Sequence, residues 1–224
     1  MSIDIIYEDS SIIVIRKPAG VATQSANPAQ PDCVSLLKEH IRKEDPNNKK
    51  EPYIGIIHRL DQPVEGLLVF AKDRRAAASL SKQVQSDIMN KHYMALVEGI
   101  VEESEETELV DHMYKDAKLS KAVIVDDKAK VAAGRLQEAK LSYLTEKILP
   151  DKNMTILSVT LKTGRFHQIR AQLSNIGHPI VGDGKYGSTS SYQKGIALVA
   201  NRLEFVHPLT GEKVEKVVDF SFCL

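Results

Sequence analysis

Residues 58–72 read His58-Arg59-Leu60-Asp61-Gln62-Pro63-Val64-Glu65-Gly66-Leu67-Leu68-Val69-Phe70-Ala71-Lys72. The second half of this stretch is a short apolar run, which is typical of a β-strand buried on both faces. The first half is polar and contains Pro63 and Gly66, so it predicts a loop that leads into the strand. Reactive side chains favour such loops, because the adjacent strand fixes their geometry. Asp61 is therefore either a reactive carboxylate or a turn-capping residue beside a surface arginine.

The composition is that of a soluble globular protein. Charged residues make up 27% and hydrophobic residues 42% of the 224 residues, enough for one large domain or two small ones. The two cysteines, Cys33 and Cys223, lie far apart and lack metal-ligand spacing, which argues against a disulfide framework and favours a reducing compartment. The sequence shows no signal peptide and no apolar run of the ~18 residues that a membrane span needs. A cytoplasmic protein without membrane contact is expected.

The charges are unevenly distributed, although the formal net charge is +0. A neutral chain argues mildly against nucleic-acid binding. Residues 98–111 contain seven acidic residues and no Lys or Arg, whereas residues 161–187 contain four Lys or Arg residues and one Asp. A locally basic face on a neutral protein can still hold a phosphate backbone.

More strands than helices are expected. Strands are predicted at residues 3–7, 12–15, 67–71, 91–99, 121–125, 139–147, 154–162, 197–200, 203–208 and 213–220. Helices are predicted at residues 34–43, from the N-cap Asp73 to Ile88, and from Arg165 to Ile176. Residues 100–135 give few signals beyond the strand at 121–125 and a turn at Gly134. Strands joined by hairpin-length turns predict an α+β protein with a largely antiparallel mixed sheet.

The third helix has a charge feature of its own. Apolar residues recur at helical spacing from residue 166 to residue 176, and Gly177 is placed as a left-handed C-terminal residue. Arg165 then falls in the first helical turn, where the helix dipole disfavours a cation. A cation there, beside unpaired backbone N–H groups, indicates an anion nearby, either a phosphate or a carboxylate.

Several stretches together resemble one enzyme family. His-Arg-Leu-Asp at residues 58–61, followed by Gly-Leu-Leu-Val-Phe-Ala-Lys, resembles the catalytic motif of the RluA-type pseudouridine synthases. Four further stretches of the chain also resemble this family. They are residues 7–20, which end in Lys-Pro-Ala-Gly, the predicted strand at 91–99, residues 163–187, which begin Thr-Gly-Arg-Phe-His-Gln-Ile-Arg, and residues 197–208. The resemblance covers most of residues 5–208.

This resemblance implies a fold and a reaction. The fold would be a pseudouridine-synthase-like catalytic domain over residues 1–224, with a long curved, mixed and mainly antiparallel sheet, flanking helices and loops, and an active-site cleft across the middle. The small extra N-terminal RNA-binding domain of many relatives would be missing. The reaction would isomerise specific uridines of a structured RNA, an rRNA or tRNA stem-loop, to pseudouridine. It would need neither metal nor organic cofactor, and a monomer is expected.

The resemblance also assigns roles to residues of this chain. Asp61 would be the ionised carboxylate, acting as a nucleophile towards the sugar or as a base, and Arg165 would pair with it. Tyr93 would lie against the uracil and take or relay the C5 proton, and Leu198 would form an apolar floor. Arg59 would fill the stack left by the flipped base. Weaker candidates for RNA contacts or site support are His58, Lys17, Lys72, His167, Gln168 and Arg170.

The chain departs from the family pattern beside the proposed carboxylate. Relatives usually have Thr-Ser where this chain has Val64-Glu65, and Val199 stands where a histidine is often found. A second unpaired carboxylate facing Asp61 would raise the Asp61 pKa. We therefore expect Glu65 to turn away and to pair with a basic side chain or with loop N–H groups.

Three alternatives remain at this point. The first is a metal hydrolase, whose ligands would be His58, Asp61, His167, His178 and Asp183, although the usual close ligand spacing on one helix is missing. The second is a catalytically silent RNA-binding module of the same fold. The third is an N-glycosidase that uses the same carboxylate but admits water.

Overall fold

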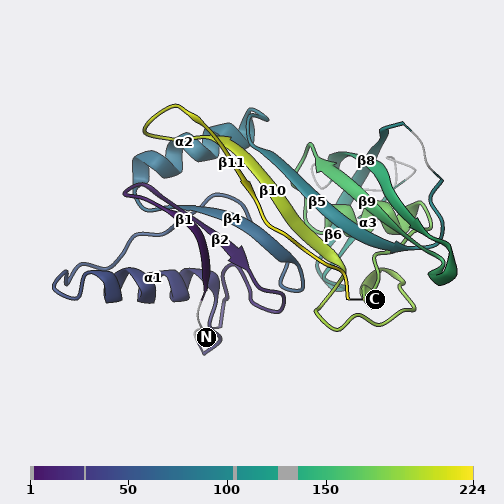
Figure 1. Cartoon of the computed structure of the whole chain (residues 1–224), viewed down its shortest axis with the longest axis horizontal. Helices are drawn as coiled ribbons and strands as arrows, with labels where there is room; N and C mark the ends of the chain where they lie inside the picture. The colour runs from purple at the N-terminus through teal and green to yellow at the C-terminus, as the bar shows by residue number, and fades with distance from the viewer. Residues whose placement is uncertain (1–2, 28, 103–104, 126–135, 224) are drawn as a thin grey trace. The chain divides into compact units, whose positions relative to one another are not determined.

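The computed structural model describes residues 3–27, 29–102, 105–125 and 136–223. The chain divides into two compact units (Figure 1). Unit 1 comprises Met1–Asn90 and Ala200–Phe220, and unit 2 comprises Lys91–Val199 and Ser221–Leu224. A single catalytic domain over residues 1–224 stays a prediction beside this division. None of the helices in the described ranges is long and apolar enough to cross a membrane.

Unit 1 contains a β-sheet and two of the helices. The elements are β1 (Asp4–Glu8), β2 (Ile12–Lys17), α1 (Cys33–Glu44), β3 (Gly55–Ile56), β4 (Glu65–Ala71), α2 (Arg74–Gln85), most of β10 (Leu198–Val206) and β11 (Lys213–Val217). The strand order is β1-β2-β4-β10, with β11 paired to β10 and β3 paired to β4. The pairs β1–β2, β2–β4, β3–β4 and β10–β11 are antiparallel.

Strand β4 is the centre of the unit 1 core. Residues Leu67 to Ala71 are at most 1% exposed, which confirms the prediction of a strand buried on both faces. Helix α2 follows directly, and the Asp73 carboxylate caps it by accepting from the backbone N–H groups of Arg75 and Ala76 at 2.7 and 2.9 Å. The prediction that the helix extends to Ile88 is wrong. It ends at Gln85, Asp87 has a positive φ of 54°, and Ile88 is 48% exposed.

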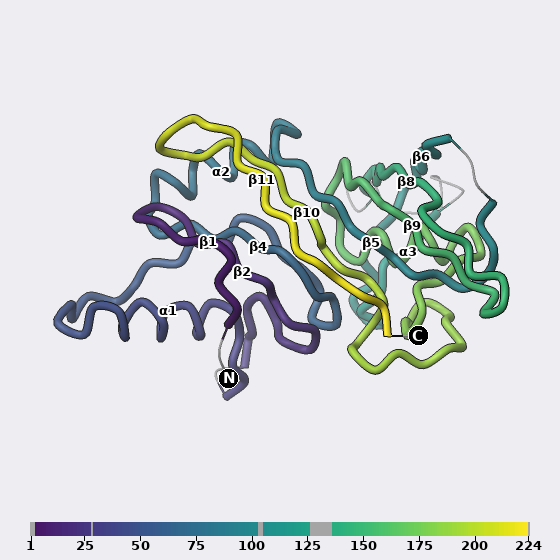
Figure 2. The backbone as a smooth tube through the Cα atoms, in the orientation of Figure 1, coloured from purple at the N-terminus to yellow at the C-terminus, as the bar shows by residue number. Residues whose placement is uncertain are grey.

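Unit 2 contains the second group of strands, whose path can be followed in Figure 2. The elements are β5 (Asn90–Glu98), β6 (Thr107–Asp116), β7 (Lys121–Ile124), β8 (Gln137–Leu149), η2 (Pro150–Lys152), β9 (Met154–Leu161), α3 (Gln168–Asn175) and η3 (Gly184–Tyr186). The strand order is β5-β9-β8-β6-β7, and these pairs are antiparallel. In β9, Thr155, Leu157 and Val159 are fully buried, and they share one face as predicted.

Two predictions for unit 2 need correction. Strand β6 was not predicted, because Met113 is its one fully buried position and most of its other residues are polar or acidic. The third helix begins at Gln168 rather than near Arg165, because His167 takes a left-handed conformation with φ 53°. Arg165 therefore precedes the helix, and the helix dipole gives no argument for an anion beside it. Gly177 has the predicted left-handed conformation, with φ 87°. The predicted turn at Gly134 lies outside the described residues.

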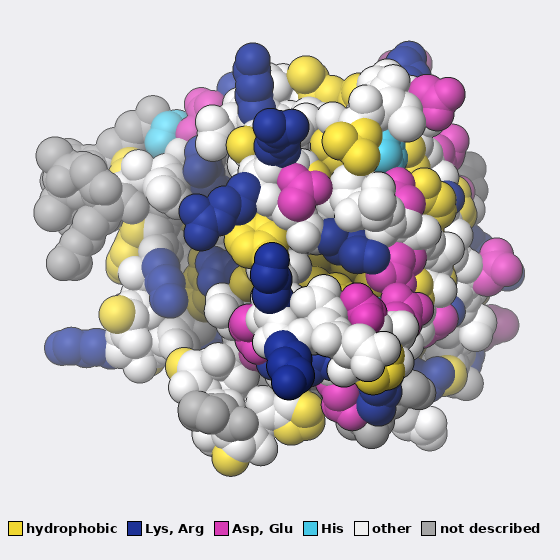
Figure 3. Space-filling view, turned by 90° about the vertical axis from the view of Figure 1, so that its left-hand side faces the viewer, with side chains coloured by type: hydrophobic (Ala, Val, Ile, Leu, Met, Phe, Trp, Pro, Cys, Tyr) yellow, Lys and Arg dark blue, Asp and Glu magenta, His cyan; other side chains and the backbone are white. Residues whose placement is uncertain are grey.

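The surface carries charges of both signs. Figure 3 shows Lys and Arg side chains together with Asp and Glu side chains on one face of the molecule, in keeping with the net charge of +0. In the acidic stretch of the sequence, Glu102, Glu105 and Glu108 are exposed, so this stretch forms a solvated acidic surface rather than a binding site for an anion.

Candidate active site

The loop that carries Asp61 is fixed by backbone contacts on both sides of this residue. The Val64 N–H donates to the Asp61 carbonyl at 3.0 Å and closes a turn. Thr23 is buried, with 3% of the residue exposed. Its hydroxyl accepts from the Leu60 N–H at 3.2 Å and donates to the Leu60 carbonyl at 3.0 Å. The peptide groups next to Asp61 are therefore held, and the carboxylate, which is half-buried, starts from a defined backbone position.

A second segment, Lys17-Pro18-Ala19-Gly20, supports the same loop. The Gly20 N–H donates to the Gln62 carbonyl at 2.8 Å, and the Gln62 side-chain amide donates to the Gly20 carbonyl at 2.9 Å. Gly20 has a φ of +86°, a conformation that glycine adopts without strain. Strand β2 ends at Lys17, as its proline and glycine predicted.

Lys17 is a buried cation beneath this loop. Its side chain is fully buried, and its Nζ donates to the carbonyl oxygens of Pro18, Val21 and Gln62 at 3.0, 2.7 and 3.1 Å. Burial lowers its pKa to about 8, although nearby Cys33, Asp61 and Glu65 act in the opposite direction. Of the two roles predicted for Lys17, this burial favours support of the site over a direct phosphate contact.

Glu65 is paired, as expected. The Arg16 guanidinium donates through Nε to Glu65 Oε1 at 2.8 Å, and its Nη2 contacts the same oxygen. The next residue, Gly66, has a φ of +132°, and a Cβ atom there would lie 2.3 Å from the Ala200 carbonyl oxygen. Glycine is therefore required where β4 approaches the backbone of β10.

The other candidates in unit 1 differ in exposure. Arg59 is exposed and therefore accessible to a ligand. His58 Nε2 accepts from the Val69 N–H at 3.4 Å, which holds the ring against β4. Lys72 Nζ donates to Glu8 Oε1 at 2.6 Å and to the Asp9 carbonyl at 2.7 Å. His58 and Lys72 thus make internal contacts that stabilise the unit.

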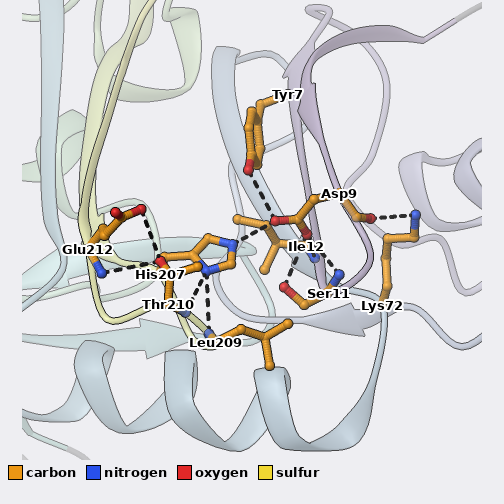
Figure 4. A network of polar contacts seen from close by, with 9 residues as sticks. All are labelled: Tyr7, Asp9, Ser11, Ile12, Lys72, His207, Leu209, Thr210 and Glu212. Atoms are coloured by element: carbon orange, nitrogen blue, oxygen red, sulfur yellow. Dashed lines mark hydrogen bonds and ion pairs between the residues drawn. The ribbon is translucent and has the colours of Figure 1, made fainter.

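A polar network that includes Asp9 and His207 was not predicted from the sequence (Figure 4). The Asp9 carboxylate accepts from the backbone N–H groups of Ser11 and Ile12 at 2.7 and 2.9 Å, and it contacts His207 Nε2 at 2.7 Å. Burial acts to raise the pKa of Asp9, but these hydrogen bonds outweigh it and hold the pKa below its usual value. The network fixes the turn between β1 and β2. An aspartate three residues before the start of a strand is the local signal that was available.

In unit 2, Tyr93 and Leu198 are buried, and Arg165 is exposed. Tyr93 lies on β5 opposite Val159 of β9 and is 5% exposed. Leu198 begins β10 and is 3% exposed. Arg165 Nε donates to the Glu138 carbonyl at 3.0 Å, which orients the guanidinium without burying it.

Gln168 braces the segment that carries Arg165. This residue is 3% exposed, and its Oε1 accepts from the Arg165 N–H at 2.9 Å and from the Thr163 hydroxyl at 2.8 Å. Its Nε2 donates to the Lys140 carbonyl at 3.0 Å. His167 Nδ1 lies 3.0 Å from the Tyr186 hydroxyl. For Gln168, the buried position favours support of the site over an RNA contact.

Arg170 is also an internal residue. It is 5% exposed, and its Nε and Nη2 donate to the two oxygens of Asp183 at 2.6 and 2.9 Å. Of the two roles predicted for Arg170, this pairing favours support of the site over a phosphate contact. The same pair occupies both oxygens of Asp183, which argues against Asp183 as a metal ligand. The basic residues of this block that remain exposed are Lys162, Arg165 and Lys185.

Comparison with known proteins decides the family. Residues 11–175 match the family model described as RNA pseudouridylate synthase. The ribosomal large subunit pseudouridine synthase D of Zymomonas mobilis is 32% identical over 224 residues, which cover 95% of this chain and 68% of the relative. The chain belongs to the RNA pseudouridylate synthase family. The RluA-type family and the enzyme class predicted from the sequence, an RNA pseudouridine synthase, are thereby confirmed.

Other members of the family agree. The uncharacterized RNA pseudouridine synthase YhcT of Bacillus subtilis is 30% identical over 217 residues, covering 95% of this chain and 67% of the relative. The chain thus spans about two thirds of the length of these curated relatives. The solved structure of human RNA Pseudouridylate Synthase Domain Containing 1 has a TM-score of 0.74 at 21% identity, and the match covers 98% of this chain and 84% of that one. This likeness confirms the predicted α+β pseudouridine synthase fold.

Proposed function

We propose that this protein converts specific uridines of large-subunit ribosomal RNA to pseudouridine. One observation carries the proposal: Asp61 lies in a turn that is held on both sides. Thr23 and Val64 bind the peptide groups that flank Asp61, and a buried lysine binds the Gln62 carbonyl. The names of the relatives support ribosomal RNA as the substrate class. The cysteine usage supports a cytoplasmic enzyme, and a monomer is expected.

The reaction needs one ionised carboxylate and no redox step. The bond between C1′ of the ribose and N1 of the uracil breaks, the base rotates, and a bond forms between C1′ and C5. C5 loses its proton and N1 gains one, so the product is an isomer of the substrate. In this proposal Asp61 attacks C1′ to give a covalent intermediate, or it removes a sugar proton to start glycal formation.

Two residues of unit 2 complete the proposed chemistry. Arg165 presents an exposed guanidinium, which would pair with Asp61 and favour its ionised form. Tyr93 would lie against the uracil and take or relay the C5 proton, with Leu198 as apolar floor. These assignments come from the sequence match and are part of the proposal.

The substrate uridine must leave its helical stack before it can react. Flipping the base costs a few kcal/mol, and a side chain that fills the vacated space recovers part of that cost. Arg59 is exposed two residues before Asp61, and we propose that it fills this space.

The first test is the release of tritium from C5 of labelled ribosomal RNA. Asp61→Asn removes the charge at nearly constant volume, so we expect turnover to fall by about a thousandfold or more while RNA binding and folding persist. Asp219→Asn is the matched control, because it removes an exposed carboxylate of the same unit. Activity of Asp61→Asn above about a thousandth of wild type would remove Asp61 from its role.

The same assay separates the rival functions. Free uracil from the wild-type protein would indicate an N-glycosidase, and RNA binding without tritium release or free uracil would indicate a silent module. Tyr93→Phe should keep the packing of β5 and lose C5 proton release, and a normal rate of release would contradict its proton-transfer role. Mapping pseudouridines in cells with and without the gene tests the RNA class. Loss confined to tRNA would overturn the ribosomal assignment.

A further inference from the structure

Arg16 and Glu65 form an ion pair at the point where the Asp61 loop leads into β4. They belong to paired strands, β2 and β4, in the register that sets Arg16 opposite Leu67 and Lys17 opposite Gly66. The Arg16 Nε lies 2.8 Å from Glu65 Oε1, and the two side chains are 32% and 20% exposed. The pair is therefore partly shielded from water, where a charge interaction is stronger than on an open surface.

Two carboxylates share the environment of a single buried cation in this loop. Lys17 is fully buried, its Nζ donates at 3.1 Å to the carbonyl of Gln62, the residue after Asp61, and it lies opposite Gly66, the residue after Glu65. Both carboxylates interact electrostatically with its ammonium group. Glu65 follows Asp61 by four residues across the turn that Val64 closes. If Glu65 had no other cation, its charge would compete for Lys17 and would disfavour the ionised form of Asp61.

We propose that Arg16 is a positioning residue for the reaction: it holds and neutralises the Glu65 carboxylate, so that Glu65 competes little with Asp61 for the buried Lys17 ammonium group. This inference rests on the proposed function, in which Asp61 acts as an anion. It gives the Val64-Glu65 departure from the family pattern a physical explanation, because Arg16 compensates on β2 for the charge that Glu65 adds on β4.

Other groups around the loop belong to the same electrostatic environment. In unit 1 they are His58, Arg59, Asp32 and the thiol of Cys33, whose pKa burial raises to about 11. Cys33 is therefore neutral at physiological pH and adds no charge. Asp32 is committed to α1, where it accepts from the Ser35 N–H at 2.7 Å and from the Ser25 N–H at 2.6 Å. Arg165, the proposed partner of Asp61, is unchanged in the variants of Arg16 and Glu65.

The test is a double-mutant cycle with two readouts. Arg16→Ala leaves Glu65 unpaired, so the acid limb of the pH–rate profile and the titration of the Asp61 carboxyl, followed by carbon-13 NMR, should both move up by roughly half a pH unit to one pH unit. Turnover should therefore fall by roughly threefold to tenfold at pH values below the midpoint of the acid limb, and it should change little well above that midpoint. In the double variant Arg16→Ala/Glu65→Ser, both readouts should return towards the wild-type values, with no more than about a third of the Arg16→Ala displacement left. Arg16→Lys, which keeps a cation, should retain most of the wild-type behaviour.

Arg42→Ala is the matched control. Arg42 pairs with Glu51 on the exposed surface of the same unit, so this variant removes an arginine from an ion pair outside the loop. It should leave the titration of Asp61 unchanged. Thermal unfolding of each variant separates a loss of folded protein from a displaced titration.

Two results would overturn the inference. One is an Asp61 titration that is the same in wild type, Arg16→Ala and the double variant. The other is a displacement in Arg16→Ala that the second substitution does not reverse, because the effect would then come from Arg16 and not from Glu65. The NMR titration of Asp61 does not depend on turnover. A wild-type protein that makes no pseudouridine would overturn the proposed function, and the electrostatic coupling between Glu65 and Asp61 could still be measured.

Discussion

The two segments that carry the proposed catalytic charges are held in different ways. The Asp61 loop, residues 58–66, is fixed by a fully buried ammonium group, the Thr23 hydroxyl and a glycine in close contact with a neighbouring backbone. The Arg165 segment, residues 163–170, is braced by the neutral amide of Gln168, and Arg165 itself stays exposed. A carboxylate that must be placed to within fractions of an ångström gains from the first arrangement. A guanidinium on a long side chain reaches its partner through its own rotamers and tolerates the second.

The largest difference between the segments is expected at their glycines. Gly66→Ala should lower the free energy of unfolding by about 4 kcal/mol or more, because the new Cβ collides with the backbone of Ala200 and φ is +132°. Gly164→Ala is the matched variant in the other segment, where the nearest atom to a new Cβ is Lys91 Nζ at 3.7 Å. It should change stability by less than about 1 kcal/mol. Urea unfolding of both proteins measures the effect, and similar losses would mean that the two segments tolerate a Cβ atom equally.

The second difference concerns the two buried side chains. Lys17→Met removes the donor for the carbonyls of Pro18, Val21 and Gln62, and Gln168→Leu removes the contacts to Thr163, Arg165 and Lys140. Each should cost about 2–3 kcal/mol near neutral pH, since buried polar partners are left unsatisfied.

Only the lysine variant should show a pH-dependent cost. The folded-state pKa of Lys17 is about 8, below the value of about 10.4 expected for an unfolded chain. Between these two pKa values the unfolded state binds more protons than the folded state, so the free energy of unfolding rises with pH. The contribution of Lys17 to stability is therefore complete above about pH 10.4 and is lost as the pH falls to about 8. The stability difference between wild type and Lys17→Met should therefore grow from pH 8 to pH 10, by up to about 1.4 kcal/mol per pH unit. A difference that is flat over this range, as expected for Gln168→Leu, would mean that folding does not lower the pKa of Lys17.

The sequence predicted the parts of the fold that local patterns determine. The buried strand β4 follows from its apolar run, the start of α2 follows from Asp73, and the alternation in β9 follows from period two. Glu65 was expected to find a basic partner because two unpaired carboxylates repel, but Arg16 could not be named. Its position opposite β4 depends on the register between β2 and β4, which is set by contacts distant in sequence.

The points that the sequence left open or misplaced concern burial and local competition. Lys17, Arg170 and Gln168 were candidates for RNA contacts or for site support, and each is buried with internal partners, which favours site support. A buried polar residue is recognised from the carbonyls and carboxylates around it, and these come from other parts of the chain. The start of α3 was misplaced because the Gln168 side chain accepts the Arg165 N–H, a contact that helical periodicity does not reveal.

The smallest difference is expected between the exposed arginines of the two segments, Arg59 and Arg165. If Arg59 fills the vacated stack, Arg59→Ala should reduce kcat/KM by about fivefold to tenfold on a stem-loop substrate and by less than about threefold on a short unstructured RNA. Arg165→Ala should reduce turnover on both substrates by the same factor, because pairing with Asp61 does not depend on the structure of the RNA. Arg75→Ala, an exposed arginine at the start of α2, is the control for a general loss of positive charge in unit 1. The ratio of kcat/KM on the two RNAs is the decisive quantity, since it cancels changes in folding and in enzyme concentration. An unchanged ratio for Arg59→Ala, together with a weaker salt dependence of RNA binding, would assign Arg59 to a phosphate contact. The two arginines would then differ in the group they bind, an RNA phosphate for Arg59 and the Asp61 carboxylate for Arg165, and Arg59 would have no part in base flipping.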